Sequence, residues 1–573
     1  MTTGQGVSVE AYGGAENRAV TSSPPLPRSP TLHDFEPLLL AELILLRAAA
    51  QGSIAKIAYQ RPRNATPDVR VRAEFLAFLA RGGSEDAPIA GNRLQILGAC
   101  VVGRLDLRHS TVPVDLWLYR CVFATAPLFA GAHLTGSLSF PGSAVPGLDA
   151  EGARIDGELA FNAGCALHGE LRLNRARIGR DLNCELMQQR PSSKFTGALP
   201  CRLVADGLHV GGDVILSGGV DALGELRFRG AQIQGDLRAS SAHIAAALES
   251  DGARGVALNL DRANIGGQLL LDAGFSAAGQ VRLQRVHVGG DLDATGAGFD
   301  AIGDAGWGDA AAVLLDRARI GGALILRGLQ RPLEGTSLID ARVGSLIDDA
   351  HSWGAHHQLD GFGYARFGDQ APADATMRLG WLATQRTAGG AAYRPDPWRR
   401  VIRVLRRMGH QHSASEVAIG RERHLRKSGL IGAELPAGMR WLARTAHAAW
   451  GVLAGYGHRP MRVLATTAAL WLLCAGAYWG AAQSELMAPT QQAARSARAP
   501  TTLRPFAYSL DVLLPLIDLR EQRRWAPAMR DDDYASLAGG VQLLIWFETL
   551  WGWFASLALI AMVSGLTDRD RRI

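Results

Sequence analysis

The densest group of side chains that could bind a metal ion consists of two aspartates and three histidines in one short segment. Carboxylate and imidazole groups are common ligands of zinc and other transition metals. Their spacing matches no metalloenzyme motif, however, and a solvated loop explains the group equally well. We therefore assign no metal site to this segment, which contains Asp348, Asp349, His351, His356 and His357.

The motifs of nucleotide chemistry are absent from the sequence. No Gly-x-Gly-x-x-Gly opens a helix after a strand, and no phosphate-binding Gly-Lys-Ser/Thr loop occurs. The glycine pairs that begin at Gly211, Gly266, Gly289 and Gly321 recur too regularly to be phosphate loops. The six cysteines lack a Cys-x-x-Cys spacing and are expected to be reduced core residues. The sequence therefore indicates no catalytic residue and no cofactor.

The glycine pairs belong to a repeat of the form Ala, any residue, Ile or Val, any residue, Gly, any residue, Leu. Clear copies begin at Ala153, Ala231, Ala263 and Ala318, and a further copy has Arg180 in place of the glycine. The central aliphatic position advances in alternating steps of 23 and 32 residues. These positions are Ile155, Ile178, Val210, Ile233, Ile265, Val288, Ile320 and Val343, with looser copies at Val101 and Leu134.

Such a repeat predicts a parallel β-helix, or solenoid, over residues 92–367. An apolar residue at every second position places the apolar side chains on one face of a strand, so that charged residues lie outside. Glycine at a fixed position would supply the tight corner between strands. A leucine-rich-repeat horseshoe is the main alternative, but the asparagine ladder of that fold is missing and the segments leave no room for helices.

Helical segments are expected to cover the open ends of the solenoid, because uncovered sheet edges promote aggregation. Residues 1–32 are predicted to form a disordered tail, and residues 33–91 a helical cap with helices at 38–58 and 69–80. Residues 368–430 are predicted to form a helical linker. Its hairpin contains helices at 398–408 and 413–427, which are separated by Gly409.

Residues 431–573 are predicted to form a membrane module. Val463–Ala482 contains no charged residue, and Val541–Leu566 contains only Glu548, so each segment can cross about 30 Å of hydrocarbon. Arginines precede the first span and follow the second, which predicts that both termini and the solenoid lie in the cytoplasm at the bacterial inner membrane. These arginines are Arg440, Arg444, Arg459, Arg462, Arg569, Arg571 and Arg572.

Glu548 is the polar residue in this module that most strongly indicates function. A carboxylate inside a membrane is energetically costly, so it is expected to face a helix partner, water or a cation. The alternative is that Glu548 reaches the lipid headgroups. Between the spans, residues 505–519 are too short to cross, and they either lie at the interface or re-enter the bilayer.

Several segments together resemble a family of uncharacterised bacterial β-helix membrane proteins. Besides the repeats, they are Leu359–Tyr364, the helical pair from Arg394 to Glu416, Gly455–Arg459 and Tyr508–Asp511. The resemblance covers roughly residues 33–572. Some members carry the automatic label "membrane-associated oxidoreductase", which implies an oxidoreductase activity but no particular cofactor or site.

The C-terminal part also resembles the pore module of two-span potassium channels. In such modules a pore helix precedes the filter, and the second span carries Glu-x-x-x-Gly, here Glu548 to Gly552. Residues Leu513–Asp518 stand where the filter would be, but they contain no glycine, and carbonyl rings need glycine. The candidate functional residues are therefore Glu548, Gly552, Tyr508, Asp511 and Asp518.

These observations favour a membrane-anchored scaffold whose solenoid surface binds a protein partner, and which forms a homo-oligomer. A degenerate channel or transport module gated by the solenoid is the first alternative, and the oxidoreductase implied by the resemblance is the second. The lipid bilayer is an expected partner. Nothing in the charge pattern indicates that the protein binds nucleic acid. A net charge of +6 over 573 residues is a mild excess that is not concentrated on one segment.

Overall fold

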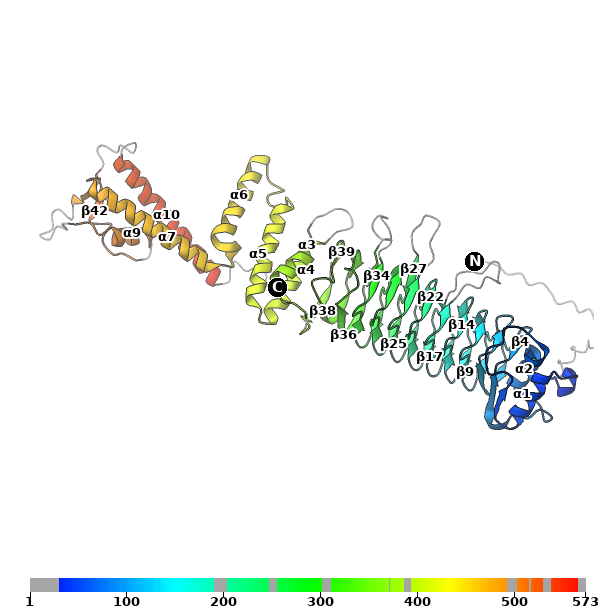
Figure 1. Cartoon of the computed structure of the whole chain (residues 1–573). Coiled ribbons are helices and arrows are strands. Elements are labelled where there is room, and N and C mark those ends of the chain that lie inside the picture. The colour runs from blue at the N-terminus through cyan, green and yellow to red at the C-terminus, as the bar shows by residue number, and fades with distance from the viewer. Residues whose placement is uncertain are drawn as a thin grey trace, which may run out of the picture.

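In the computed structural model, short parallel strands occupy the middle of the chain and helices lie on both sides of them. The strands form sheets of 21, 10 and 9 members. Figure 1 shows them stacked along one axis, with helices at each end of the stack. We call residues 54–367, from β1 (Ile54–Lys56) to β40 (Gly363–Phe367), the strand stack. The structure describes residues 30–189, 203–246, 255–300, 311–369, 371–385, 393–491, 502–514, 517–528 and 537–564.

The central aliphatic residues of the repeat lie in strands of the 21-stranded sheet, and the leucine or valine four residues later lies in the same sheet. The central aliphatic residues are direct partners in the parallel register, for example Ile155 with Ile178 and Val210 with Ile233. The predicted spacing is therefore confirmed as a structural register. The strands are β12 (Arg154–Ile155), β16 (Arg177–Ile178), β20 (His209–Val210), β24 (Gln232–Ile233), β28 (Asn264–Ile265), β32 (His287–Val288), β36 (Arg319–Leu326) and β38 (Arg342–Asp348).

The register also decides which of the looser copies align with the central aliphatic residues of the repeat. Leu134 does, because it is the partner of Ile155. Val101 does not, because it pairs with Phe123 in the 10-stranded sheet, and the aligned position belongs to Val112. The three longer steps contain residues 190–202, 247–254 and 301–310, which lie outside the described residues. The strands on either side of these segments keep the register.

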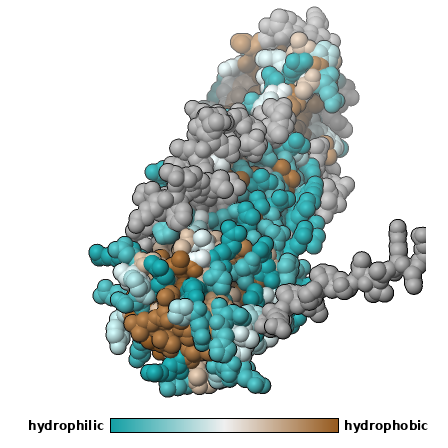
Figure 2. All heavy atoms as spheres, turned by 90° about the vertical axis from the view of Figure 1, so that its right-hand side faces the viewer, coloured by the Kyte–Doolittle hydropathy of each residue, from teal (hydrophilic) through white to brown (hydrophobic). Residues whose placement is uncertain are grey.

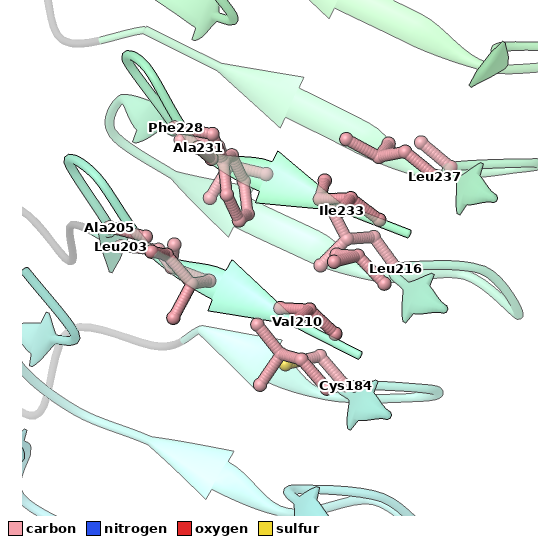
Figure 3. Close-up of a cluster of buried hydrophobic side chains, with 14 of the residues drawn as sticks. Cys184, Leu203, Ala205, Val210, Leu216, Phe228, Ala231, Ile233 and Leu237 are labelled. Atoms are coloured by element: carbon pink, nitrogen blue, oxygen red, sulfur yellow. The ribbon is translucent and has the colours of Figure 1, made fainter. Parts of the chain in front are cut away.

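The interior of the stack is filled by aliphatic and aromatic side chains from all three sheets. Figure 3 shows Val210 and Ile233 from the repeat beside Leu203 and Phe228. All four are at most 1% exposed. The 10-stranded sheet runs from β2 (Arg70–Arg72) to β34 (Gly298–Asp300), and the 9-stranded sheet from β11 (Leu148–Asp149) to β39 (His357–Gln358).

The glycine of the repeat makes room for an aspartate of the preceding turn of the stack, so the expectation that it simply forms a corner needs correction. Asp213 Oδ1 accepts a hydrogen bond from the Asp236 backbone N–H at 2.8 Å. A Cβ on Gly235 would lie 2.0 Å from that oxygen. Arg180 occupies the position of the repeat's glycine in its turn, and there the preceding turn has Glu158 in place of the aspartate. The same aspartate–glycine pairing joins Asp181 to Gly212, Asp236 to Gly267 and Asp291 to Gly322.

The N-terminal end of the stack is covered by α1 (Leu40–Ala50) and α2 (Ala73–Ala80). The predicted helices at 38–58 and 69–80 are both too long. Gly52 adopts a left-handed conformation and the chain then forms β1, while β2 precedes α2. Strands β1 and β2 pair with the next strands of the stack, so residues 33–91 are not only helical. Figure 2 shows a hydrophobic patch on this end, where Leu40, Leu43 and Ile54 are exposed.

A buried ion pair closes the C-terminal end of the stack. Arg378 of α3 (Ala375–Ala383) donates two hydrogen bonds to Asp348, at 2.6 and 2.8 Å, and both side chains are 0% exposed. Trp353 Nε1 donates to the same carboxylate at 2.7 Å. The Arg378 guanidinium lies 3.8 Å from the centre of the Phe367 ring. Asp348 is therefore fully paired although it is buried.

The predicted helical hairpin follows as α4 (Pro395–Arg407) and α5 (Gln411–Lys427). Gly409 separates the two helices with φ of +85°. Val401, Val404 and Leu405 of α4 are buried, as the sequence pattern predicts.

The remaining described residues form a second helical group. It comprises α6 (Ala437–Ala454), α7 (Pro460–Gln483), α9 (Pro505–Leu513) and α10 (Leu537–Val563). A two-stranded antiparallel ribbon of β41 (Met487–Pro489) and β42 (Trp525–Pro527) lies between α7 and α10 in the chain. The predicted disordered tail lies almost wholly outside the described residues, and so does the end of the second predicted span, because the description of that part stops at residue 564.

Candidate functional site

Helices α7 and α10 are long and apolar enough to cross a membrane. They contain 24 and 27 residues, with mean hydropathies of 1.4 and 1.6 in their most apolar windows. Only 22% and 28% of those windows are buried inside the protein. Leu473 and Leu550, for example, are 72% and 70% exposed. A core helix of a soluble protein would be mostly buried, so this exposure favours an apolar surrounding for both helices.

The short helix α9 packs against both long helices. Tyr508 is 1% exposed, and its ring meets the Tyr478 ring of α7 edge to face with centroids 5.0 Å apart. Trp471 Nε1 of α7 donates to the Phe506 carbonyl of α9 at 3.2 Å. Segment 505–519 is therefore in part a helix held by protein, which is the condition for backbone at membrane depth.

Glu548 lies at the junction of α7, α9 and α10 and is 0% exposed. The Tyr478 hydroxyl donates to Glu548 Oε2 at 2.8 Å, and the Ser509 hydroxyl of α9 hydrogen-bonds to Oε1. Glu548 follows Leu537 by eleven residues and precedes Val563 by fifteen. At about 1.5 Å per residue, it lies roughly 16 and 22 Å from the two ends of the helix. Its carboxyl group faces side chains of α7 and α9.

A carboxyl group that carries a proton would complete this hydrogen-bond set. Ser509 Oγ is 3.3 Å from the Trp471 carbonyl as well as bonded to Glu548. One hydroxyl proton serves one acceptor, so a protonated Glu548 can donate to Ser509 while Ser509 donates to Trp471. Among the described residues, no cationic side chain forms an ion pair with Glu548. The geometry therefore accommodates a neutral acid that links three helices.

Gly552 and Asp511 stabilise the end of α9. A Cβ on Gly552 would lie 1.9 Å from the Leu513 carbonyl oxygen, so only glycine permits this approach of α10 to α9. Asp511 is 7% exposed and accepts backbone hydrogen bonds from Leu519 at 2.6 Å and from Gln522 at 2.8 Å. Both candidate residues therefore lie where α9 ends and the chain turns back.

Four of the five candidate residues belong to this three-helix arrangement, and Asp518 does not. The Asp518 side chain is 50% exposed and pairs with Arg523 at 2.7 Å. Sequence reasoning missed Tyr478 and Ser509, which make the hydrogen bonds to Glu548. Hydroxyl groups are common in apolar segments, so no pattern in the sequence singles out these two residues.

The aspartate and histidine group at 348–357 does not form a common site. Asp348 is bound by Arg378 and Trp353, and Asp349 accepts backbone hydrogen bonds from Gly328 and His351. His357 is buried and bonded to the Gly354 carbonyl at 3.1 Å, and burial lowers its pKa to about 4. The described residues contain no group of three or more such side chains that could hold a metal ion.

Replacing Glu548 by alanine should lower the thermal unfolding midpoint of the detergent-solubilised protein, because the buried Tyr478 and Ser509 hydroxyls lose their hydrogen-bond partner. The expected decrease in the free energy of unfolding is about 2 kcal/mol. Glu548→Gln keeps one acceptor and one donor in nearly the same shape, so we expect a loss below about 1 kcal/mol. Equal losses in the two variants would contradict the hydrogen-bond role.

The fold and this site define a protein of stacked parallel strands followed by two helices that are able to cross a membrane, with a short helix between them. Comparison of the chain with protein-family models, with curated proteins and with solved structures gave no match.

Proposed function

We propose that this protein is a membrane-tethered interaction scaffold. Its strand stack would be a parallel β-solenoid that presents regular rows of charged side chains. Helices α7 and α10 would cross the bacterial inner membrane and keep the solenoid on the cytoplasmic side. The parallel registers and the exposed apolar faces of the two helices support the two halves of this proposal.

One row of side chains carries the binding part of the proposal. It occupies the residue before each inward aliphatic position, and from Arg154 to Arg342 all its members are exposed. Parallel strands are about 4.8 Å apart, so these side chains recur at that interval. We call the following residues the Arg/His row: Arg154, Arg177, His209, Gln232, Asn264, His287, Arg319 and Arg342.

Open grooves run along the Arg/His row. One of about 460 Å³ is lined by Arg154, Arg177 and His209, and another of about 310 Å³ by His287, Arg319 and Arg342. Glycines form part of the floor of both grooves. Among the described residues, Arg177, Arg319 and Arg342 take part in no ion pair. These three arginines, set among polar residues along open grooves, suit an extended acidic segment of a protein partner.

Native mass measurement of the complex purified in mild detergent tests this function. We expect a mass above that of one 61.0 kDa chain. The charge-reversal variant Arg177→Glu/Arg319→Glu should lose the partner's mass. A matched control, Arg175→Glu/Arg262→Glu, changes two exposed arginines at another corner of the stack and should retain it. A single-chain mass for the wild type, or equal loss in both variants, would refute the scaffold.

A channel or transport module is the second candidate, and the position of Glu548 favours it. An acid near the middle of α10 that contacts α7 and α9 is the kind of residue that proton and ion pathways use. Conductance in proteoliposomes that disappears in both Glu548→Ala and Glu548→Gln would support this candidate. No contact among the described residues favours the oxidoreductase activity, which stays a prediction of the resemblance.

A further inference from the structure

Helix α6 turns its polar side chains toward the protein. Arg444 donates to the Gly429 carbonyl, which follows α5, at 3.0 Å. His447 Nε2 lies 3.3 Å from a carboxylate oxygen of Glu422 on α5. Within α6 only Ala454 is buried. The inner face of this helix thus makes polar contacts with α5 and its neighbouring loop, and only its C-terminal turn joins a small apolar cluster, through Trp450 and Ala454.

The opposite face of α6 is apolar and exposed. Trp441, Leu442 and Val452 are 67%, 61% and 72% exposed. The apolar residues recur every three or four positions, which places them along one stripe of the helix. The stripe contains Met439, Leu442, Ala446, Ala449 and Val452, with Trp441 beside it.

This arrangement is the reverse of the usual one for a helix on a soluble protein, whose apolar stripe faces the core. Leaving large apolar side chains in water forgoes about 25 cal/mol for each Å² that burial would remove from solvent. The stripe therefore requires an apolar partner outside the described chain.

The connection of α6 to the proposed spans identifies that partner as lipid. The connection between α6 and α7 consists of the short turn Gly455–Gly457 and two further residues. Met461 at the start of α7 is 71% exposed. The Trp450 ring of α6 meets the Phe554 ring of α10 with centroids 6.1 Å apart. Figure 1 shows α6 and α7 running in different directions, so α6 does not simply extend the span.

The charge around α6 favours an anionic membrane surface. Residues 437–462 contain four arginines and no acidic residue. Each basic residue near an anionic leaflet adds electrostatic attraction to that surface. A helix with arginines on one side and tryptophan and leucine on the other is typical of segments that lie at the lipid interface.

We propose that α6 lies in the plane of the membrane surface, with Met439, Leu442 and Val452 inserted among the acyl chains and the neighbouring arginines at anionic headgroups. The proposal rests on the membrane tether of the proposed function. It adds a second kind of membrane contact, which would fix α5 and the end of the solenoid close to the bilayer.

Fluorescence quenching by brominated lipids tests this position. The five described cysteines are buried, and Cys201→Ser removes the one outside the described residues. On this background, single cysteines replace Leu442 or Val452 of α6, Leu473 of α7 as a span control, and exposed Arg423 of α5 as a surface control. Each full-length variant is labelled with an environment-sensitive dye and reconstituted in phosphatidylcholine vesicles with or without phosphatidylglycerol.

We expect lipids brominated near the headgroup to lower the fluorescence at positions 442 and 452 about twofold, since interfacial helices insert about 5–10 Å. Lipids brominated deep in the chain should quench position 473 and leave 423 unaffected. If the dye is quenched at position 473 but not at positions 442 and 452, the in-plane position of α6 is refuted and the proposed spans are not. An unquenched 473 would instead refute the membrane tether. Equal quenching at position 442 in vesicles with and without phosphatidylglycerol would contradict the role of anionic headgroups.

Discussion

Replacing Gly289 by alanine should destabilise the strand stack by about 3 kcal/mol, because the added methyl group overpacks a rigid site. Its Cβ would lie 2.2 Å from the carbonyl oxygen of Gly266 in the preceding turn. That oxygen belongs to the backbone, so it cannot move without displacing the paired strands β28 and β32. Hydrogen exchange of the amides in these strands measures the local free energy of opening.

The neighbouring Gly290 provides a matched control. A Cβ there would meet Cγ of the exposed Gln268 side chain at 2.9 Å, and this side chain can move aside. The Cβ would also lie 3.1 Å from the Gly267 carbonyl oxygen, a contact that a small shift relieves, unlike the 2.2 Å contact at Gly289. We expect Gly290→Ala to cost less than about 1 kcal/mol. If the two alanine variants exchange at the same rate, close backbone stacking does not explain the repeated glycines.

The second large effect is expected for Arg378→Met, which leaves the Asp348 carboxylate buried without its cation. Breaking a buried pair in this way typically costs about 3–5 kcal/mol. The loss should be local to the C-terminal end of the stack, and hydrogen exchange at β38 and β40 should report it. Arg172→Met removes an ion pair whose arginine is 51% exposed, and its effect should stay below about 1 kcal/mol.

A double variant separates the lost charge pairing from lost packing. Asp348→Asn removes the unpaired charge of Arg378→Met while it keeps an acceptor for Trp353. We expect Arg378→Met/Asp348→Asn to regain at least half of the lost stability, because an uncharged amide is easier to bury than a carboxylate. A double variant as unstable as Arg378→Met would show that the arginine acts through its contact with Phe367.

The sequence was most informative about the strand stack, because its signal is repeated many times. Each inward aliphatic residue confirms the position of the others, so the register could be read without knowledge of any contact. The interpretation failed at the start of the stack. Val101 was preferred to Val112 because Ala99, Val101, Gly103 and Leu105 match the repeat, whereas Val112 is followed by no glycine at the corresponding position. The helix boundaries near Gly52 failed because a strand of three residues leaves little pattern.

The candidate site was predictable only in part. A charge inside an apolar segment is conspicuous, so Glu548 could be singled out, and its spacing to Gly552 placed both on one face of a helix. The hydroxyl groups of Tyr478 and Ser509 are common in apolar segments and carry no such signal. Their roles depend on how three helices far apart in the sequence pack, which no local pattern encodes. The same holds for Arg378, whose partner Asp348 is 30 residues away.

The aspartate–glycine pairing between neighbouring turns sets the increment by which this molecule can change in length. The pairing recurs in successive turns, as Asp181–Gly212, Asp213–Gly235 and Asp236–Gly267, so the gain or loss of one such turn still places an aspartate beside a glycine and leaves both capped ends untouched. One turn corresponds to roughly 5 Å along the axis. The distance between the two capped ends can therefore be lengthened or shortened in such increments, as in a spacer made of interchangeable segments.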